Sequence, residues 1–324
     1  MAFARTWRHA SAAEGPARVM EADIPALNTV FSEAFTDRYR RDGLIGVRVP
    51  HLNPAVWRFA IADAEGGAMC WRNSRGSIIA FNIAHRSGVE GWMGPLAVHP
   101  DHQGHGIGKS VVLAGVEWLK ERGARVIGLE TMPRTMDNVG FYSALGFTPG
   151  RLTVTLTLEG VRGRQHAILY SALDDTAKSE ILEKSADLTD AFAAGYDYRR
   201  EISLTGAHGL GETLVLESGG QIRAFAICHS VPLVQGRIRE EVRVLKLVAR
   251  TAADADELIT QLCIYTRNTT AKRMAVRVQS EYDEVYRGLI QRGARVRWTD
   301  LRMSLSGFGE GTPESGIVLS NWEI

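Results

Sequence analysis

The sequence has little cysteine and no long apolar run. Its 324 residues include three cysteines, Cys70, Cys228 and Cys263, which are widely spaced and form no C-x-x-C pair. This spacing disfavours a disulfide framework or a thiolate metal cluster and favours reduced, buried thiols. No apolar segment approaches the roughly 20 residues of a membrane-spanning helix, and the first residues lack the apolar core of a signal peptide. We therefore expect a cytoplasmic protein with no membrane partner and no metal.

An excess of charge of either sign is also missing. Lysine and arginine number 38, aspartate and glutamate 37, and the formal net charge is +1. No overall field therefore favours nucleic acid or an anionic membrane as a partner. At this length, with 45% hydrophobic residues, the chain can bury a large core and is expected to form two domains.

Glycine is patterned in one informative stretch, residues 92–110, which reads WMGPLAVHPDHQGHGIGKS. Its first half is apolar with a break at Gly94-Pro95, and a proline at position 100 should end the strand because proline cannot donate to a ladder. Gly104, Gly106 and Gly108 then alternate before an amphipathic helix. A strand, a glycine-rich turn and a helix start form an arrangement that binds phosphate, since amides and the helix dipole face one concavity.

Two common phosphate-binding patterns do not fit this turn. The Walker pattern needs a glycine where the chain has Gln103, and the Rossmann pattern needs GxGxxG rather than alternating glycines. The pattern that fits is Q-x-x-G-x-G directly after an apolar strand. This resembles motif A of the GCN5-related N-acetyltransferases (GNATs), and Asn138 and the run FYSALGF at 141–147 add to the resemblance, which covers roughly residues 18–160.

The resemblance implies a mixed, mostly antiparallel sheet flanked by helices, with a splayed central strand, and acetyl-CoA as the cofactor. Its pyrophosphate would lie on the glycine turn and its pantetheine arm along the open strand edge, where an amide near Ala97 would polarise the acetyl carbonyl. The cofactor-binding residues implied are the following: Leu96, Ala97, Val98, Gln103, Gly104, His105, Gly106, Ile107, Gly108, Lys109, Ser110, Asn138, Phe141 and Tyr142.

Acetyl transfer also needs an acid for the leaving thiolate and a base for the amine. The resemblance implies Tyr142 as the acid, four residues after Asn138 and so on the same helix face. Packing of an amphipathic ring is the alternative reading of Tyr142. Glu90 and Glu130 are the nearby carboxylates and hence the candidate bases, although each could equally be a solvated or capping residue.

The acceptor is less well defined. Arg38, Tyr39 and Trp92 are the candidate substrate-binding residues, with packing and a solvated helix end as their alternatives. We expect transfer to the primary amine of a small molecule by direct attack in a ternary complex. Acetylation of a protein or peptide amine, or a sensor that binds acetyl-CoA without turnover, are the alternatives. The sequence leaves monomer and homodimer open.

A second copy follows the first. FNIAH at 81–85 recurs as FAICH at 225–229, and the glycine after each short helix recurs at Gly146 and Gly293. Where the glycine turn belongs, the second copy has Asp254, Asp256 and Glu257, whose carboxylates would repel phosphate. The α/β chain is thus expected to hold two tandem GNAT-like domains, the second without a cofactor site. The expected boundaries are a flexible leader at 1–17, a catalytic domain at 18–160, a linker at 161–195 and the degenerate domain at 196–324.

Local patterns predict the elements around the turn. Residues 22–35 should form an amphipathic helix, 57–62 and 77–85 strands, 105–122 a helix that ends at Gly123, 125–130 a strand and 138–145 a helix.

Overall fold

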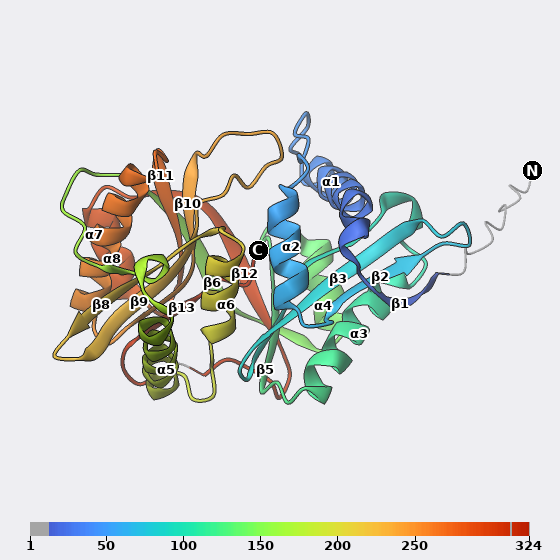
Figure 1. Cartoon of the computed structure of the whole chain (residues 1–324). Helices are drawn as coiled ribbons and strands as arrows, with labels where there is room; N and C mark the ends of the chain where they lie inside the picture. Colours follow the sequence, from blue (N-terminus) through green and yellow to red (C-terminus); the bar gives the residue numbers. More distant parts are fainter. Residues whose placement is uncertain (1–12, 312, 324) are drawn as a thin grey trace, which may run out of the picture.

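The computed structural model describes residues 13–311 and 313–323. Its strands form one thirteen-stranded sheet that runs through both halves of the molecule (Figure 1). The elements of the first half are β1 (Glu14–Arg18), α1 (Ile24–Arg41), α2 (Pro54–Asp63), β2 (Ala68–Arg72), β3 (Ile78–Ser87), β4 (Glu90–Val98), α3 (Ile107–Glu121), β5 (Val126–Thr131), α4 (Met136–Ala144) and β6 (Phe147–Glu159). Those of the second half are β7 (Ile168–Leu169), α5 (Asp175–Phe192), α6 (Arg199–Ala207), β8 (Gly211–Ser218), β9 (Gln221–His229), β10 (Glu241–Ala249), α7 (Ala252–Asn268), β11 (Arg273–Gln279), α8 (Asp283–Gln291), β12 (Arg295–Leu305) and β13 (Ile317–Ser320).

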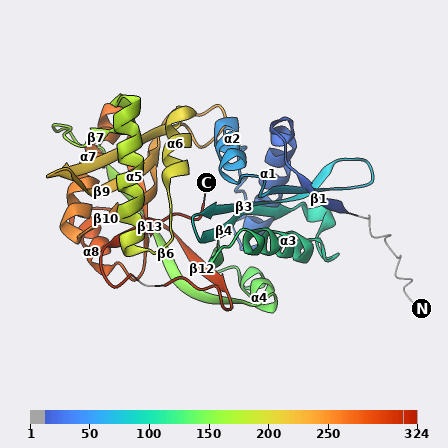
Figure 2. The same cartoon turned by 60° about the horizontal axis from the view of Figure 1, so that its bottom comes forward.

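The two halves repeat one arrangement of elements. The order β2-β3-β4-α3-β5-α4-β6 recurs as β8-β9-β10-α7-β11-α8-β12. The matching peptides FNIAH and FAICH both lie on the strand before the central strand of their half, β3 and β9. Figure 2 shows α1 and α2 on one face of the first half's strands and α3 and α4 on the other. The fold therefore contains the repeat that the sequence predicts.

The halves exchange their last long strands. β5 of the first half pairs with β12, and β11 of the second half pairs with β6, while β6 and β12 pair with each other at the centre of the sheet. A boundary at residue 160 therefore divides the chain but not the sheet. As a consequence, side chains from β11 and β12 reach the first half's site.

Two expectations from local pattern differ from the structure. Residues 57–62 were expected as a strand, which is wrong: they belong to α2, which begins with Asn53 accepting from the Ala55 amide at 3.0 Å and with Pro54 in the first turn. Val56, Trp57 and Ala60 are buried at helical spacing. At the N-terminus, Glu14–Arg18 form an edge strand on β2, so this part of the expected leader is ordered, and residues 1–12 lie outside the described residues.

The remaining predicted elements of the first half are present, some with longer bounds. The predicted helix at 22–35 is α1, which continues to Arg41, and the helix before Gly123 is α3. Val111, Val112 and Leu119 of α3 are fully buried against the sheet. Among the described residues no helix is both long and apolar enough to cross a bilayer.

Candidate functional site

The central strand of the first half separates from its parallel neighbour halfway along its length. β4 pairs with β5 only from Glu90 to Met93, and the pairing stops at the Gly94-Pro95 break. On its other side β4 remains paired with β3 as far as Val98. The last residues of β4 therefore present one free backbone edge, which is the opening that the sequence predicts.

The direction of the backbone groups on this edge follows from the register. The His99 amide donates to the Ile79 carbonyl at 2.8 Å, so His99 and Ile79 form a hydrogen-bonded pair. Because such pairs alternate in an antiparallel ladder, Ala97 also turns its amide toward β3, and the amides of Leu96 and Val98 face the opening. Leu96 and Val98 are thus the residues placed to pair with an inserted extended arm, flanking the position expected from the sequence.

The glycine turn lies where this edge ends. Gly104 and Gly106 both have left-handed backbone, with φ of +80° and +82°, and nothing lies within 4 Å of a Cβ built on either. Gly106 is the N-cap of α3, so the next three amides have no acceptor within the helix. Lys109 and Ser110 are exposed beside them. The turn therefore offers free amides, the positive end of a helix and a lysine to an anion.

Side chains hold this turn against the strand. The Gln103 side-chain amide donates to the Val98 carbonyl at 3.0 Å, which ties the turn to the end of β4. His99 Nε2 lies 2.5 Å from a Glu33 carboxylate oxygen, and its Nδ1 accepts from the Asp101 amide at 3.2 Å. His99 is therefore occupied on both ring nitrogens. Among the described residues no group of three or more metal-binding side chains comes together.

Helix α4 closes the site from the second side. The Phe141 ring of α4 lies 3.4 Å from where a Cβ on Gly108 would lie, so α4 packs against the first turn of α3. Asn138 is partly exposed and donates to the Thr131 hydroxyl at 3.4 Å. Tyr142 is 6% exposed among apolar neighbours, and burial raises the pKa of its phenol well above the usual value. Tyr142 is thus held in its protonated form.

The equivalent opening in the second half is filled by the chain itself. β10 pairs with β11 only from Glu241 to Arg243, as β4 does with β5. Beyond that point β13 pairs with β10, with Lys246 opposite Ser320 and Ala249 opposite Ile317. The acidic residues at the start of α7 are also occupied, since Arg223 binds Asp254 at 2.5 Å and Glu257 at 2.9 Å. Neither an open edge nor a glycine turn is present there.

The structure places both candidate bases in fully paired surroundings. Glu90 is completely buried and accepts from the Trp322 indole at 2.7 Å and the Tyr198 hydroxyl at 3.1 Å, with the Lys246 ammonium at 3.5 Å. All three partners come from the second half, so Glu90 joins the halves.

Glu130 is equally enclosed. It accepts from Arg302 at 2.9 Å and Thr153 at 2.5 Å on one oxygen, and from Arg277 at 2.6 Å on the other. Burial favours its neutral form, but the two guanidinium groups hold the pKa of this carboxyl below its usual value. A group in this state is a weak proton acceptor.

The three candidate substrate residues have different surroundings. Arg38 binds Asp42 at 2.5 Å and Asp137 at 3.3 Å, and so links α1 to α4. Trp92 is 4% exposed and stacks on His85 with ring centroids 3.9 Å apart, in the core. Tyr39 is partly exposed, and its ring lies 6.2 Å from that of Trp298 on β12. Of the three, Tyr39 is the one that is neither buried nor held in an ion pair among the described residues.

Four residues near Tyr39 were missed by sequence reasoning, and all belong to the second half: Arg277, Trp298, Asp300 and Glu323. Arg277 binds Glu323 at 2.6 Å and Asp300 at 3.0 Å, and the Trp298 indole donates to Asp300 at 3.1 Å. No local motif marks these residues. Only the exchange of β6 and β12 brings them to the first half.

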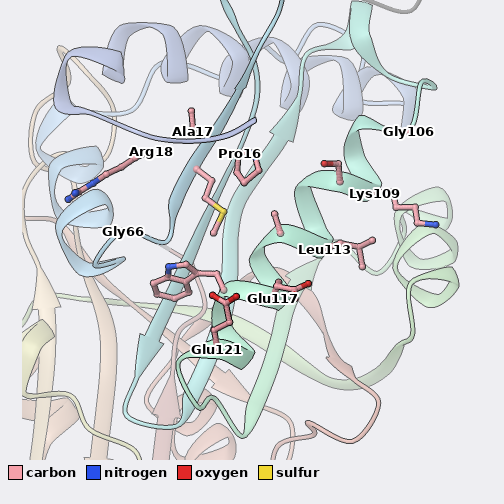
Figure 3. Close-up of a pocket in the computed structure, with 13 residues that line it drawn as sticks. Pro16, Ala17, Arg18, Gly66, Gly106, Lys109, Leu113, Glu117 and Glu121 are labelled. Carbon is pink, nitrogen blue, oxygen red and sulfur yellow. The ribbon is translucent and has the colours of Figure 1, made fainter. Parts of the chain in front are cut away.

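A hollow of about 790 Å³ lies along α3 (Figure 3). It runs from Gly106 and Lys109 along α3, beneath β1, to Glu117 and Glu121. The hollow thus shares Gly106 and Lys109 with the glycine turn, while its far end is acidic and unsuited to an anion.

Comparison with known proteins agrees with this geometry. Residues 28–147 match the sequence model described as the Acetyltransferase (GNAT) family. A putative acetyltransferase from Pyrococcus horikoshii superposes with a TM-score of 0.69 at 13% identity, covering 98% of this chain and 97% of that chain. A tandem GNAT protein from the clavulanic acid biosynthesis pathway gives 0.58 at 11% identity, covering 90% and 98%. N-myristoyltransferase from Saccharomyces cerevisiae, solved with myristoyl-CoA, gives 0.63 at 9% identity, covering 92% and 80%. At these identities the similarity to solved structures shows the fold.

Proposed function

We propose that this chain, whose residues 28–147 belong to the acetyltransferase (GNAT) family, transfers an acetyl group from acetyl-CoA to the primary amine of a small molecule in one ternary complex. The observation that carries this proposal is the contrast between the halves. β4 has a free edge that ends at a left-handed glycine turn, whereas the equivalent edge of β10 is covered by β13. One acetyl-CoA per chain follows from this contrast.

Different residues of the chain would bind the diphosphate and the pantetheine arm of acetyl-CoA. The amides at the start of α3, after Gly106, would hold the diphosphate, and Lys109 would add a cation. The amides of Leu96 and Val98 would pair with the pantetheine arm as an added strand does. One of these amides would also stabilise negative charge on the acetyl oxygen. When bound, the thioester supplies an activated acetyl group.

Tyr142 would protonate the departing sulfur. Its phenol is buried and stays protonated at neutral pH. A general acid positioned in this way contributes roughly 100- to 10,000-fold to the rate. Packing against Phe141, at a ring distance of 5.2 Å, fixes the orientation of its ring.

The second half supports a small acceptor rather than a protein. The connection between β9 and β10 crosses to the loop before α2, where the Asn53 amide donates to the Leu233 carbonyl at 2.8 Å and the Gln235 amide to the His51 carbonyl at 3.0 Å. The C-terminal segment adds Trp322 beneath β4. These contacts cover the loop before α2 and the Gly94 break with residues of the second half, and we infer that the covered surface favours a small acceptor.

The test is release of free thiol from acetyl-CoA in the presence of a panel of small primary amines. Acceptor-dependent release supports the enzyme. Binding of acetyl-CoA without release, with every small amine and with peptides, would instead support a sensor. Release with peptides alone would support the protein-acetylating alternative.

A further inference from the structure

The C-terminal segment brings a carboxylate to the point where β4 leaves β5. A Cβ built on Gly94, the residue of the break, would lie 3.2 Å from the Trp322 carbonyl oxygen. Trp322 is anchored there, because its indole donates to Glu90 and its ring lies 4.0 Å from the Arg302 guanidinium. The next residue, Glu323, is therefore held beside the opening.

Glu323 is the carboxylate at this place that remains accessible. Half of its side chain is exposed (50%), against 1% for Glu130 and none for Glu90. Its one cationic partner among the described residues is Arg277, which Glu130 and Asp300 also share. Asp300 likewise has no other cationic partner there. Glu323 and Asp300 are thus both neutralised by the Arg277 guanidinium, which also binds Glu130.

Aromatic rings lie next to these carboxylates. Tyr39 from α1 and Trp298 from β12 face each other at 6.2 Å, and Trp298 is hydrogen-bonded to Asp300. Burial raises the pKa of Tyr39, and the negative charges of Glu323 and Asp300 add to the rise. The ring is therefore close enough to both carboxylates to interact with them electrostatically. The Arg134 guanidinium already lies over the Trp298 ring, 5.4 Å from its centroid, and opposes the rise in the pKa of Tyr39. An organic ammonium would therefore add a second cation beside Glu323 and Asp300, which share Arg277, and lay its body on the exposed part of the Tyr39 ring.

We propose that Glu323 takes the proton from an acceptor ammonium that binds between its carboxylate and the rings of Tyr39 and Trp298. This inference rests on the proposed function and names the acceptor as a primary amine with an apolar or aromatic body. The Glu323 carboxylate becomes a carboxylic acid, and the amine becomes neutral. The nitrogen then forms a C–N bond to the acetyl carbonyl carbon as the C–S bond breaks, and the Tyr142 hydroxyl protonates the sulfur. The second proton lost by nitrogen restores the phenol through solvent, and Glu323 releases its own proton to solvent.

The charged surroundings suit this role. Partial desolvation raises the pKa of the half-exposed Glu323 carboxyl above its usual value, with Asp300 and Glu130 adding to the rise and Arg277 opposing it. Those three groups act on Glu323 from β11, β12 and β5, and Tyr39 lies within range on α1. The Arg134 guanidinium, from the segment before α4, lies over Trp298 and is the further charged group of this site. A base with a pKa near the working pH is the most effective one.

The test uses the full chain with 2-phenylethylamine as the probe acceptor and follows thiol release between about pH 5 and 9. For the wild type, kcat/KM for the amine should rise through a limb that lies above the usual glutamate pKa of 4.5. Glu323→Gln should lose this limb and about 100-fold of the rate, while its affinity for acetyl-CoA stays within about twofold. Glu323→Asp should keep the limb at reduced rate. Glu314→Gln, an exposed carboxylate earlier in the same segment, should match the wild type.

Each other outcome has a defined meaning. An unchanged rate and pH profile in Glu323→Gln would overturn the proposal for Glu323. Failure to acetylate 2-phenylethylamine by a wild type that binds acetyl-CoA would overturn the acceptor assignment. Failure of the wild type to bind acetyl-CoA would instead refute the proposed function. Thermal unfolding of each variant checks that its fold is intact, and Glu323→Asp retains the test if Glu323→Gln does not fold.

Discussion

Comparing Gly106→Ala with Gly123→Ala should distinguish a loss of cofactor binding from a loss of stability. Gly106 has φ of +82° at the N-cap of α3, and Gly123 has φ of +75° just beyond the other end of the same helix. Neither has an atom within 4 Å of a built Cβ. An L residue in left-handed backbone costs about 1–2 kcal/mol, so both alanine variants should lose a similar amount of stability.

Only Gly106→Ala should lose cofactor affinity. Its methyl group would project into the open space over the turn, and relaxation of the strained backbone would turn the Ile107 amide away from the anion. A hydrogen bond to a charged group is worth about 1.5–3 kcal/mol, so losing one corresponds to roughly a 10- to 100-fold rise in the Kd for acetyl-CoA.

Calorimetric titration with acetyl-CoA and thermal unfolding of both variants measure the two effects. Equal affinity in Gly106→Ala and the wild type would refute the assignment of the diphosphate to this turn. An equal loss of affinity in Gly123→Ala would show that the defect comes from destabilising α3 and not from the turn.

Two further predictions concern buried groups. Tyr142→Phe should lower kcat by about 100-fold and leave acetyl-CoA affinity within about twofold, whereas Tyr170→Phe in the second half should leave kcat unchanged; a loss confined to affinity would argue against the acid role. Glu201 is buried, accepts from the Ser87 hydroxyl, and has one carboxylate oxygen without a partner. Burial raises the pKa of this carboxyl from its usual 4.5 to about 7, so the folded state binds its proton more tightly than the unfolded state, and stability should fall as the pH rises through this range. A difference of one in pKa corresponds to about 1.4 kcal/mol, so the free energy of unfolding should fall by about 3 kcal/mol as the pH rises to 7 and above. Glu201→Gln should remove this pH dependence, which thermal unfolding at a series of pH values measures. The same dependence of stability on pH in the variant and the wild type would contradict the prediction.

The parts of the site that lie within one short stretch could be predicted from the sequence. The break at Gly94-Pro95, the alternating glycines and the following helix dictate local backbone geometry, and the structure confirms the open edge of β4 and the left-handed turn. The internal repeat also follows from the sequence, because similar peptides recur at a near-constant offset.

The parts that depend on contacts between the halves could not be predicted. Glu90 and Glu130 are close in sequence to the residues of the opening, but their partners Lys246 and Arg277 are far from them in sequence. Pairing of β12 with β5 and of β13 with β10 depends on strand exchange, which leaves no local pattern. The helix α2 was predicted as a strand because its short apolar run fits either period.

The most direct test of the account is a crystal structure of the chain with coenzyme A. We predict one molecule per chain, with its diphosphate on the amides that follow Gly106 and its pantetheine arm along Leu96–Val98. Coenzyme A bound against β10 with β13 displaced, or at the start of α7 near Thr251, would contradict it.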